Sequence, residues 1–402
     1  MRKHQVVIVG GGVGGSSTAL HMARAGLDVL MVEKDNFPRD KPCGDGIVQS
    51  VHPLLDSMGI LDDLVKNGYQ CTGTIFSDPN QNMYTYHYEE GAFALAIPRF
   101  IGDDIMNKAA VNSGIDYLEN FEATKVLFER GQAVGVRGIY NGVVVELEAD
   151  LVVLADGGHS MLARQCGFFE ENPDYVFYGI RGYFEGIRGL SDVIEFHYPH
   201  EMFMPAGYTW IFPLGKTKGN VGVFITETAL NNTGMTIEEL LWWWRDTTEI
   251  GGLRLGEATQ IGDIKGWRLP SGKHQPIHGA GVLAVGDCAN MIEPLFGGGY
   301  PHAVTAGVCA AKVAREAVDA NDFSKEFLGK YVEYVNEALG SGYAIQELLR
   351  KQVFGTTKDI QELIDFSIEK FEGKRLSGGD AMAIFLKERR DFKGATKSAY
   401  SK

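Results

Sequence analysis

The stretch Val6-Val7-Ile8-Val9-Gly10-Gly11-Gly12-Val13-Gly14-Gly15 decides the fold of this chain of 402 residues. Four β-branched residues in a row are typical of a strand that is buried on both faces. The glycines that follow fit the pattern G-x-G-x-x-G, in which the backbone turns sharply and a helix begins close to a bound phosphate. Residues 16–25 are predicted to form that helix, and residues 28–32 a second strand.

An acidic residue, Glu33, closes the second strand. A carboxylate here accepts hydrogen bonds from the ribose hydroxyls of an adenosine and repels a 2′-phosphate. The βαβ unit therefore predicts a site for FAD or NAD rather than NADP. The expected cofactor contacts in this unit are Gly10, Gly12, Gly14, Gly15, Glu33 and Lys34.

A second strand–glycine–helix unit, far along the chain, favours FAD over NAD. Residues 281–285 form an apolar strand, and Pro301 suits the first turn of a helix that continues to residue 318. The N-terminus of that helix would stabilise the negative charge of a reduced flavin, and Asp287 could hold a ribityl or phosphate-side hydroxyl. The expected contacts here are Gly286, Asp287, Pro294, Gly298, Gly299 and Tyr300.

Three segments carry a resemblance to a known superfamily. The N-terminal glycines, Ala155-Asp156-Gly157-Gly158-His159-Ser160 and Gly286-Asp287 are similar to the three FAD signatures of class A flavoprotein monooxygenases and their relatives. The resemblance implies an α/β fold of the para-hydroxybenzoate hydroxylase type, with a Rossmann-like FAD-binding domain and an inserted antiparallel β-sheet that binds substrate. It adds Asp156, Gly157, Arg99 and Ala123 to the expected FAD contacts.

Four other stretches resemble the geranylgeranyl reductase family more closely. They are the cysteine-bearing loop at residues 38–46, the strands at 180–186 and 220–223, and the Y-x-W-x-F-P motif at residues 208–213. The resemblance implies that Cys43, with Gly44 and Gly46, lies in the active site near the flavin. The chain departs from the family at Gly298-Gly299-Tyr300-Pro301, where members often have Gly-Glu-Gly-Ile, so an aromatic ring is expected near the flavin.

Four residues are candidates for catalysis: Cys43, Tyr208, Trp210 and His302. A thiol at Cys43 could donate a proton to one carbon of a double bond while the flavin delivers hydride to the other. Tyr208, Trp210 and Phe212 alternate along a strand and so share one face, which with Tyr300 would form the wall of an apolar substrate site. The competing interpretation is packing alone, for the thiol, the aromatic face and His302 alike.

Three functions remain open on this reasoning. The first is an FAD-dependent oxidoreductase that reduces C=C bonds of a prenyl-type substrate. The second is a monooxygenase or halogenase that acts on an aromatic natural product through a C4a-hydroperoxyflavin, although the halogenase pattern G-W-x-W-x-I-P is only partly matched at residues 208–213. The third is a non-catalytic carrier that binds prenyl groups.

Composition limits the partners. A formal net charge of −14 argues against nucleic-acid binding. Five cysteines without a C-x-x-C pair argue against a structural zinc site, and His197 and His200 are expected to be surface residues, so no metal is predicted. The absence of a second G-x-G-x-x-G implies an external electron donor, which could be NAD(P)H, a flavin reductase or a ferredoxin.

The sequence also predicts where the protein is located and where its domains begin and end. No run reaches the ~18 apolar residues of a membrane span, so the protein is expected in the cytoplasm, with peripheral membrane contact left open. The FAD domain should comprise residues 1–70, 96–165 and 270–322, and the substrate domain 71–95 and 166–269. Residues 323–402 should be helical with a short polar tail. The successive Trp242, Trp243 and Trp244 are predicted to lie on a helix that contacts a membrane or lines the substrate mouth.

Overall fold

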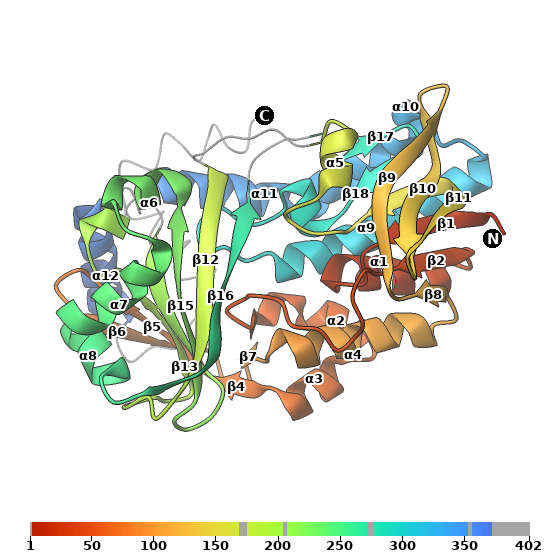
Figure 1. The fold of residues 1–402 in the computed structure, drawn as a ribbon. Coiled ribbons are helices and arrows are strands. Elements are labelled where there is room, and N and C mark those ends of the chain that lie inside the picture. Colours follow the sequence, from red (N-terminus) through yellow and green to blue (C-terminus); the bar gives the residue numbers. More distant parts are fainter. Residues whose placement is uncertain (1, 169–174, 204–206, 272–275, 353–355, 372–402) are drawn as a thin grey trace.

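The computed structural model describes residues 2–168, 175–203, 207–271, 276–352 and 356–371. Two large sheets form the two ends of the molecule, and helices pack around and between them (Figure 1). The mixed α/β architecture that was predicted is confirmed. The predicted polar tail lies outside the described residues.

The first sheet is built around the predicted βαβ unit and has the central order β17-β18-β11-β1-β2-β8. Neighbouring strands from β18 to β8 run parallel, and a meander of β9, β10 and the first half of β11 extends from it. Its strands are β1 (His4–Val9), β2 (Val29–Val32), β8 (Asp116–Leu118), β9 (Phe121–Glu129), β10 (Gln132–Tyr140), β11 (Val143–Leu154), β17 (His278–Gly279) and β18 (Val282–Ala284).

Two helices lie side by side where this sheet meets the predicted cofactor site. They are α1 (Val13–Arg24) and α9 (Tyr300–Ala320). A Cβ placed on Gly307 of α9 would come within 2.7 Å of the Ser17 hydroxyl and 2.8 Å of the Thr18 nitrogen, so glycine at this position allows the helices to pack closely. The Ser17 hydroxyl also donates to the Val304 carbonyl at 2.9 Å. Both helix N-termini are thereby brought to one region of the fold.

The second sheet has seven strands in the order β16-β12-β15-β14-β13-β5-β6. All pairs are antiparallel except β13 and β5, which run parallel. That one parallel pair departs from the antiparallel sheet that was predicted, because β5 enters from a separate segment of the chain. Its strands are β5 (Gly73–Ser77), β6 (Met83–His87), β12 (Val176–Glu185), β13 (Val193–His197), β14 (Tyr208–Pro213), β15 (Gly219–Thr226) and β16 (Thr259–Pro270).

This sheet has two covered faces. The outer face packs Ile211, Val221 and Val223 against α6 (Glu227–Thr233), α7 (Ile237–Thr247) and α8 (Glu249–Leu255) (Figure 1). The inner face carries an aromatic cluster that includes Phe196, Tyr208 and Trp210. Side chains alternate along each strand, so the Y-x-W-x-F-P motif presents its aromatic rings to the inner face only.

The remaining elements connect the two sheets. A three-stranded sheet of β3 (Gly46–Ile47), β7 (Ala94–Ala96) and β4 (Tyr69–Cys71) lies beside α2 (His52–Met58), α3 (Leu61–Asn67) and α4 (Arg99–Asn112), and α5 (Met161–Gln165) follows β11. After α10 (Lys325–Leu328), the long α11 (Lys330–Gln352) starts in the core of the first sheet and ends in the aromatic cluster of the second. Helix α12 (Thr357–Phe371) packs against β6.

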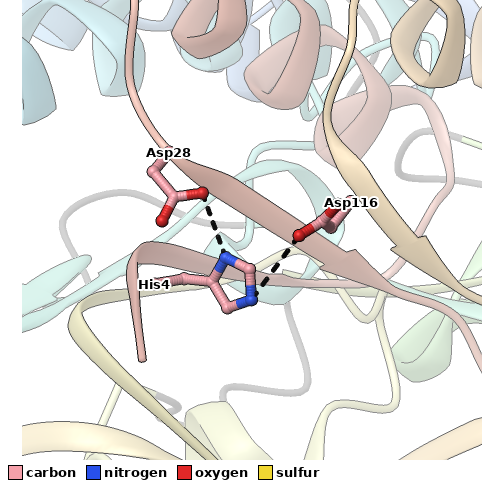
Figure 2. A group of neighbouring side chains, drawn as sticks. All are labelled: His4, Asp28 and Asp116. Carbon is pink, nitrogen blue, oxygen red and sulfur yellow. Dashed lines mark hydrogen bonds and ion pairs between the residues drawn. The ribbon is translucent and has the colours of Figure 1, made fainter. Parts of the chain in front are cut away.

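A polar cluster of His4, Asp28 and Asp116 lies where the parallel strands β1, β2 and β8 begin, and Figure 2 shows how the three side chains face one another. His4 Nδ1 lies 3.2 Å from Asp28 and His4 Nε2 lies 3.8 Å from Asp116. The three residues offer metal-type ligand atoms within 4.8 Å of one another. The guanidinium of Arg2 already bridges both carboxylates, at 3.0 and 2.9 Å, and so supplies the positive charge that they attract.

Candidate active site

The glycine loop after β1 is held by close backbone contacts. Gly10 has a φ of +105°, and a Cβ on Gly15 would lie 1.8 Å from the Gly10 carbonyl oxygen. Glu33 is buried at the end of β2, where it accepts the Gly11 N–H at 2.7 Å and the Asp35 N–H at 3.0 Å. The carboxylate is therefore fixed beside the glycine loop, and its contact with a ribose stays a prediction.

One side of this loop is open enough for a cofactor phosphate to approach. A Cβ on Gly12 would meet one neighbour in the described part of the chain, the terminal Nη2 of Arg39 at 3.0 Å. Nearby, Asp156 Oδ1 is buried and has no hydrogen-bond partner among the described residues, and burial raises the pKa of Asp156 to about 6. An open glycine face, the cation of Arg39 and an unpaired polar atom fit a bound dinucleotide, which Gly12, Arg39 and Asp156 would hold.

The second glycine segment meets the same region. Gly299 precedes α9, and a Cβ there would lie 3.2 Å from Asp287 Oδ1. Asp287 Oδ2 forms an ion pair with Lys41 at 2.8 Å. Although burial works against its charge, this pair lowers the pKa of Asp287. An ionised Asp287 beside the start of α9 can accept a hydrogen bond from a cofactor hydroxyl.

The cysteine loop, residues 38–46, runs between the two sheets and pairs with both. Arg39 contacts Asp103 of α4 at 2.8 Å, on the side of the first sheet. The next residue, Asp40, faces the second sheet, where it pairs with Arg181 of β12 at 2.5 Å and Lys265 of β16 at 2.7 Å. Alternating charges therefore anchor the loop at the junction of the two sheets.

Cys43 lies in the middle of this loop, half-buried and as a free thiol. It is an electrostatic neighbour of the Arg99 guanidinium. Arg99 itself is buried at the start of α4 and forms a two-pronged ion pair with Asp103, at 2.5 and 2.8 Å. The ion pair with Asp103 therefore holds a cation in a fixed place beside the sulfur.

The aromatic motif covers the cysteine loop from the second sheet. A Cβ on Gly44 would lie 3.0 Å from the Phe212 ring and 3.5 Å from Trp210 Nε1, and one on Gly46 would lie 2.9 Å from Phe212. Tyr208 donates its hydroxyl to the Phe296 carbonyl at 2.6 Å. The cysteine loop thus lies against this aromatic face, here called the aromatic wall, next to Cys43.

The first turn of α9 carries two predicted site residues, Tyr300 and His302, whose side chains point to different places. Tyr300 has Asp103, Arg99 and Cys43 as electrostatic neighbours, and burial raises its pKa. Its hydroxyl lies 2.8 Å from Met106 Sδ. His302 instead bonds the Met291 carbonyl through Nδ1 at 3.0 Å and packs its ring on Tyr343 of α11. The structure brings Tyr300 to the cysteine loop and directs His302 toward α11.

Other predicted contacts lie around the same region or farther along the first sheet. Gly286, with a φ of +75°, lies beside Ala303 of α9, and Gly298 donates its N–H to Glu293 at 3.3 Å in the loop that contains Pro294. Ala123 is half-buried in β9, where it pairs with Gly138 of β10. Gly157 has a φ of +86° directly after Asp156, and Lys34 directly follows Glu33.

Two polar residues of this site were not predicted. Asp45 is buried with a left-handed φ of 67°, and Asn220 is fully buried on β15. The available signals were local: a carboxylate between Gly44 and Gly46, and an amide inside the run 220–223 that resembles a family strand. Neither signal indicates that the two side chains meet at 2.8 Å, because 175 positions separate them in sequence.

Two expectations about the second sheet need correction. His197 is not a surface residue but is 1% exposed, bonded to Ser77 at 2.8 Å and to Glu195 at 3.0 Å. Helix α7 with Trp242, Trp243 and Trp244 packs on the outer face, opposite the aromatic motif, and so does not line the aromatic wall. Ser77 on the neighbouring strand β5 and Glu195, two residues earlier on the same strand β13, make this burial of His197 possible.

The fold and the site define a flavoprotein oxidoreductase. A family model described as FAD binding domain matches residues 3–308, and the chain belongs to this family. A digeranylgeranylglycerophospholipid reductase of Thermoplasma volcanium is 28% identical over 347 residues, which cover 84% of each chain. These findings confirm FAD as the cofactor and the resemblance to geranylgeranyl reductases, and they leave the non-catalytic carrier without support.

Solved structures show the same fold. A geranylgeranyl bacteriochlorophyll reductase-like protein of Thermoplasma acidophilum has a TM-score of 0.88 at 24% identity and covers 97% of both chains. A flavin-dependent brominase has a TM-score of 0.77 at 21% identity, covering 92% of this chain and 93% of its own. Among the described residues, no helix is both long and apolar enough to cross a membrane.

Proposed function

We propose that the protein is a reductase that saturates C=C bonds in the prenyl chain of a lipid. The observation that carries the proposal is the contact between the cysteine loop and the aromatic motif. Phe212 and Trp210 lie against Gly44, next to the Cys43 thiol and its neighbour Arg99. A prenyl chain needs an apolar wall for binding, and its alkene carbons need a proton donor at that wall.

The reaction divides between cofactor and protein. When bound and reduced, FAD supplies a hydride to one alkene carbon. Cys43 gives its proton to the other carbon, so that two C–H bonds replace the π bond, and the thiolate left beside Arg99 regains a proton from solvent. The electrons for this hydride would come from an external donor of the NAD(P)H, flavin reductase or ferredoxin class.

Relatives support this substrate class. The curated relative from Thermoplasma volcanium is named for a phospholipid that carries geranylgeranyl chains. A substrate of this kind resides in membranes, so the proposal includes transient contact with a membrane surface. Oxygenation or halogenation of an aromatic substrate is the competing function, because a flavin-dependent brominase shares the fold.

Turnover of a prenyl lipid by Cys43 variants tests the proposal. Purified enzyme with reduced FAD is incubated without oxygen with a geranylgeranyl lipid, and mass spectrometry counts the hydrogen atoms gained. We expect a gain of two hydrogens per double bond, and a loss of about 10²–10⁴-fold in rate for Cys43→Ala with FAD still bound. Full activity of Cys43→Ala would remove the thiol from the mechanism, and no gain of hydrogen in the wild type would reject the function.

A further inference from the structure

Asn220 uses every hydrogen-bonding group of its amide at the junction of the two sheets. Its Nδ2 donates to the Cys43 carbonyl at 2.7 Å and to Asp45 Oδ2 at 2.8 Å, and its Oδ1 accepts the Trp210 Nε1–H at 2.9 Å. The side chain is fully buried. A buried asparagine that satisfies two donors and one acceptor is held in a single orientation.

The acceptor side of this amide orients the Trp210 indole. Trp210 is opposite Gly222 in the pairing of β14 with β15. A Cβ on Gly222 would lie 2.2 Å from Trp210 Cζ2 and 2.4 Å from Cη2, so the six-membered part of the indole occupies the space beside the glycine. The glycine makes room for the ring, and the bond to Asn220 determines which edge of the indole points toward the cysteine loop.

The donor side holds the turn that carries Cys43. Asp45 takes a left-handed φ of 67° two residues later and accepts three hydrogen bonds. They come from Asn220, from the Tyr183 hydroxyl at 2.8 Å and from the Arg99 backbone N–H at 3.3 Å. Since Arg99 also places its guanidinium beside the thiol, the main chain and the electrostatic partner of Cys43 are fixed through one carboxylate.

We infer that Asn220 is a positioning residue for the reduction, holding the Cys43 main chain and the Trp210 indole in one mutual arrangement so that the thiol faces a chain lying on the aromatic wall. This inference rests on the proposed function, because a role in reduction requires that the protein reduces a prenyl chain at Cys43. In this proposal Asn220 touches neither the alkene nor the flavin signatures. It acts through its contacts with Cys43 and Trp210. A bare packing role would give Asn220 the same burial but no control over the thiol.

Two variants and a control separate these roles. Asn220→Ala removes all three hydrogen bonds, whereas Asn220→Asp keeps an acceptor for Trp210 and loses both donors to the cysteine loop. Val221→Ala is the matched control, because it opens a space in the same strand on the outer face. All are tested as FAD-loaded enzyme, with flavin absorbance to report cofactor content.

The first measurement needs no substrate. Iodoacetamide is added and alkylation of Cys43 is followed by mass spectrometry, with the half-buried Cys166 in the same sample as internal reference. Freeing the loop should speed alkylation of Cys43 by about fivefold for each hydrogen bond lost, at an unchanged rate for Cys166. Val221→Ala should alkylate at the wild-type rate.

The second measurement is steady-state reduction of a geranylgeranyl lipid. Asn220→Asp should lower kcat by about 10²-fold with KM near the wild-type value, because the aromatic wall keeps its indole in place. Asn220→Ala should lower kcat and also raise KM.

Wild-type alkylation rates in both variants would overturn the inference, as would a kcat loss no larger than that of Val221→Ala at equal melting temperature. If Cys43 alkylation speeds up but no prenyl lipid is ever reduced, the positioning of the thiol stands and the proposed function fails.

Discussion

The Phe212 ring of the second sheet lies against the α-carbon of Gly44 in the cysteine loop, so that a methyl group there would come to 3.0 Å from Cε2. Gly44→Ala should therefore displace the loop from the aromatic wall. We expect a stability loss of about 1–3 kcal/mol from overpacking, together with a fall in prenyl reduction at unchanged FAD content. Gly252→Ala in the exposed part of α8, where the nearest atom would be 3.6 Å away, is the control and should keep full activity.

Gly12 and Gly15 should respond differently to the same substitution. Among the described residues, a methyl group at Gly12 would meet one atom, the terminal Nη2 of Arg39 at 3.0 Å, whereas at Gly15 it would lie 1.8 Å from the Gly10 carbonyl. Gly12→Ala should keep the apoprotein folded and weaken FAD binding by at least about tenfold, a cost of about 1.4 kcal/mol. Gly15→Ala should lower the melting temperature of the apoprotein itself. Equal FAD affinity in Gly12→Ala, measured by flavin fluorescence, would mean that the phosphate does not approach this glycine.

Asp45 should make stability depend on pH in the acid range. Burial raises its pKa from 3.8 to about 6, against the opposing effects of Asn220, Tyr183, Arg181 and Arg99. The folded state then binds the proton more tightly than the unfolded state. Protonated Asp45 therefore contributes to the free energy of unfolding in full below pH 3.8, and this contribution is lost as the pH rises through about 6.

The Asp45→Asn variant lacks this titration. Its free energy of unfolding relative to the wild type should rise by about 2 kcal/mol between pH 4 and pH 7. Urea denaturation of both proteins at several pH values measures the difference between their free energies of unfolding. The other carboxyls titrate alike in both proteins, so their effects cancel in this difference. A difference that stays constant with pH would show that Asp45 titrates normally.

Trp243 should matter for stability but not for turnover. Its ring lies 6.2 Å from that of Phe203 and 5.9 Å from that of His200, in the layer that covers the outer face of the second sheet. Trp243→Gln should cost about 1–2 kcal/mol of stability and leave kcat and KM for a prenyl lipid unchanged. A raised KM in this variant would place α7 at the substrate entrance after all.

The sequence predicted the elements that are formed by residues close together in the chain. The strand, glycine loop, helix and Glu33 appear as predicted, although α1 starts at Val13 rather than at residue 16. The difference arises because Gly14 and Gly15 already lie inside the helix, packed on Val285 and on the Gly10 carbonyl.

The polar network around Cys43 could not be predicted in the same way. Arg181 and Asp40 are 141 residues apart, and Asn220 and Cys43 are 177 apart, yet each pair meets at 2.5 to 2.7 Å. Such contacts depend on how the second sheet docks on the cysteine loop, which no strand periodicity encodes. The same reason applies in part to His197, because one of its two hydrogen-bond partners, Ser77, is 120 positions away on the neighbouring strand β5.

The central claim is that reduced FAD in this protein passes its electrons to a C=C bond. The most direct test is to reduce the bound flavin without oxygen, mix it in a stopped-flow instrument with a geranylgeranyl lipid, and follow flavin absorbance. The account predicts that the oxidised spectrum returns with formation of the saturated lipid, and that Cys43→Ala slows this step. A flavin that stays reduced with the lipid and reoxidises only when oxygen is admitted would contradict it.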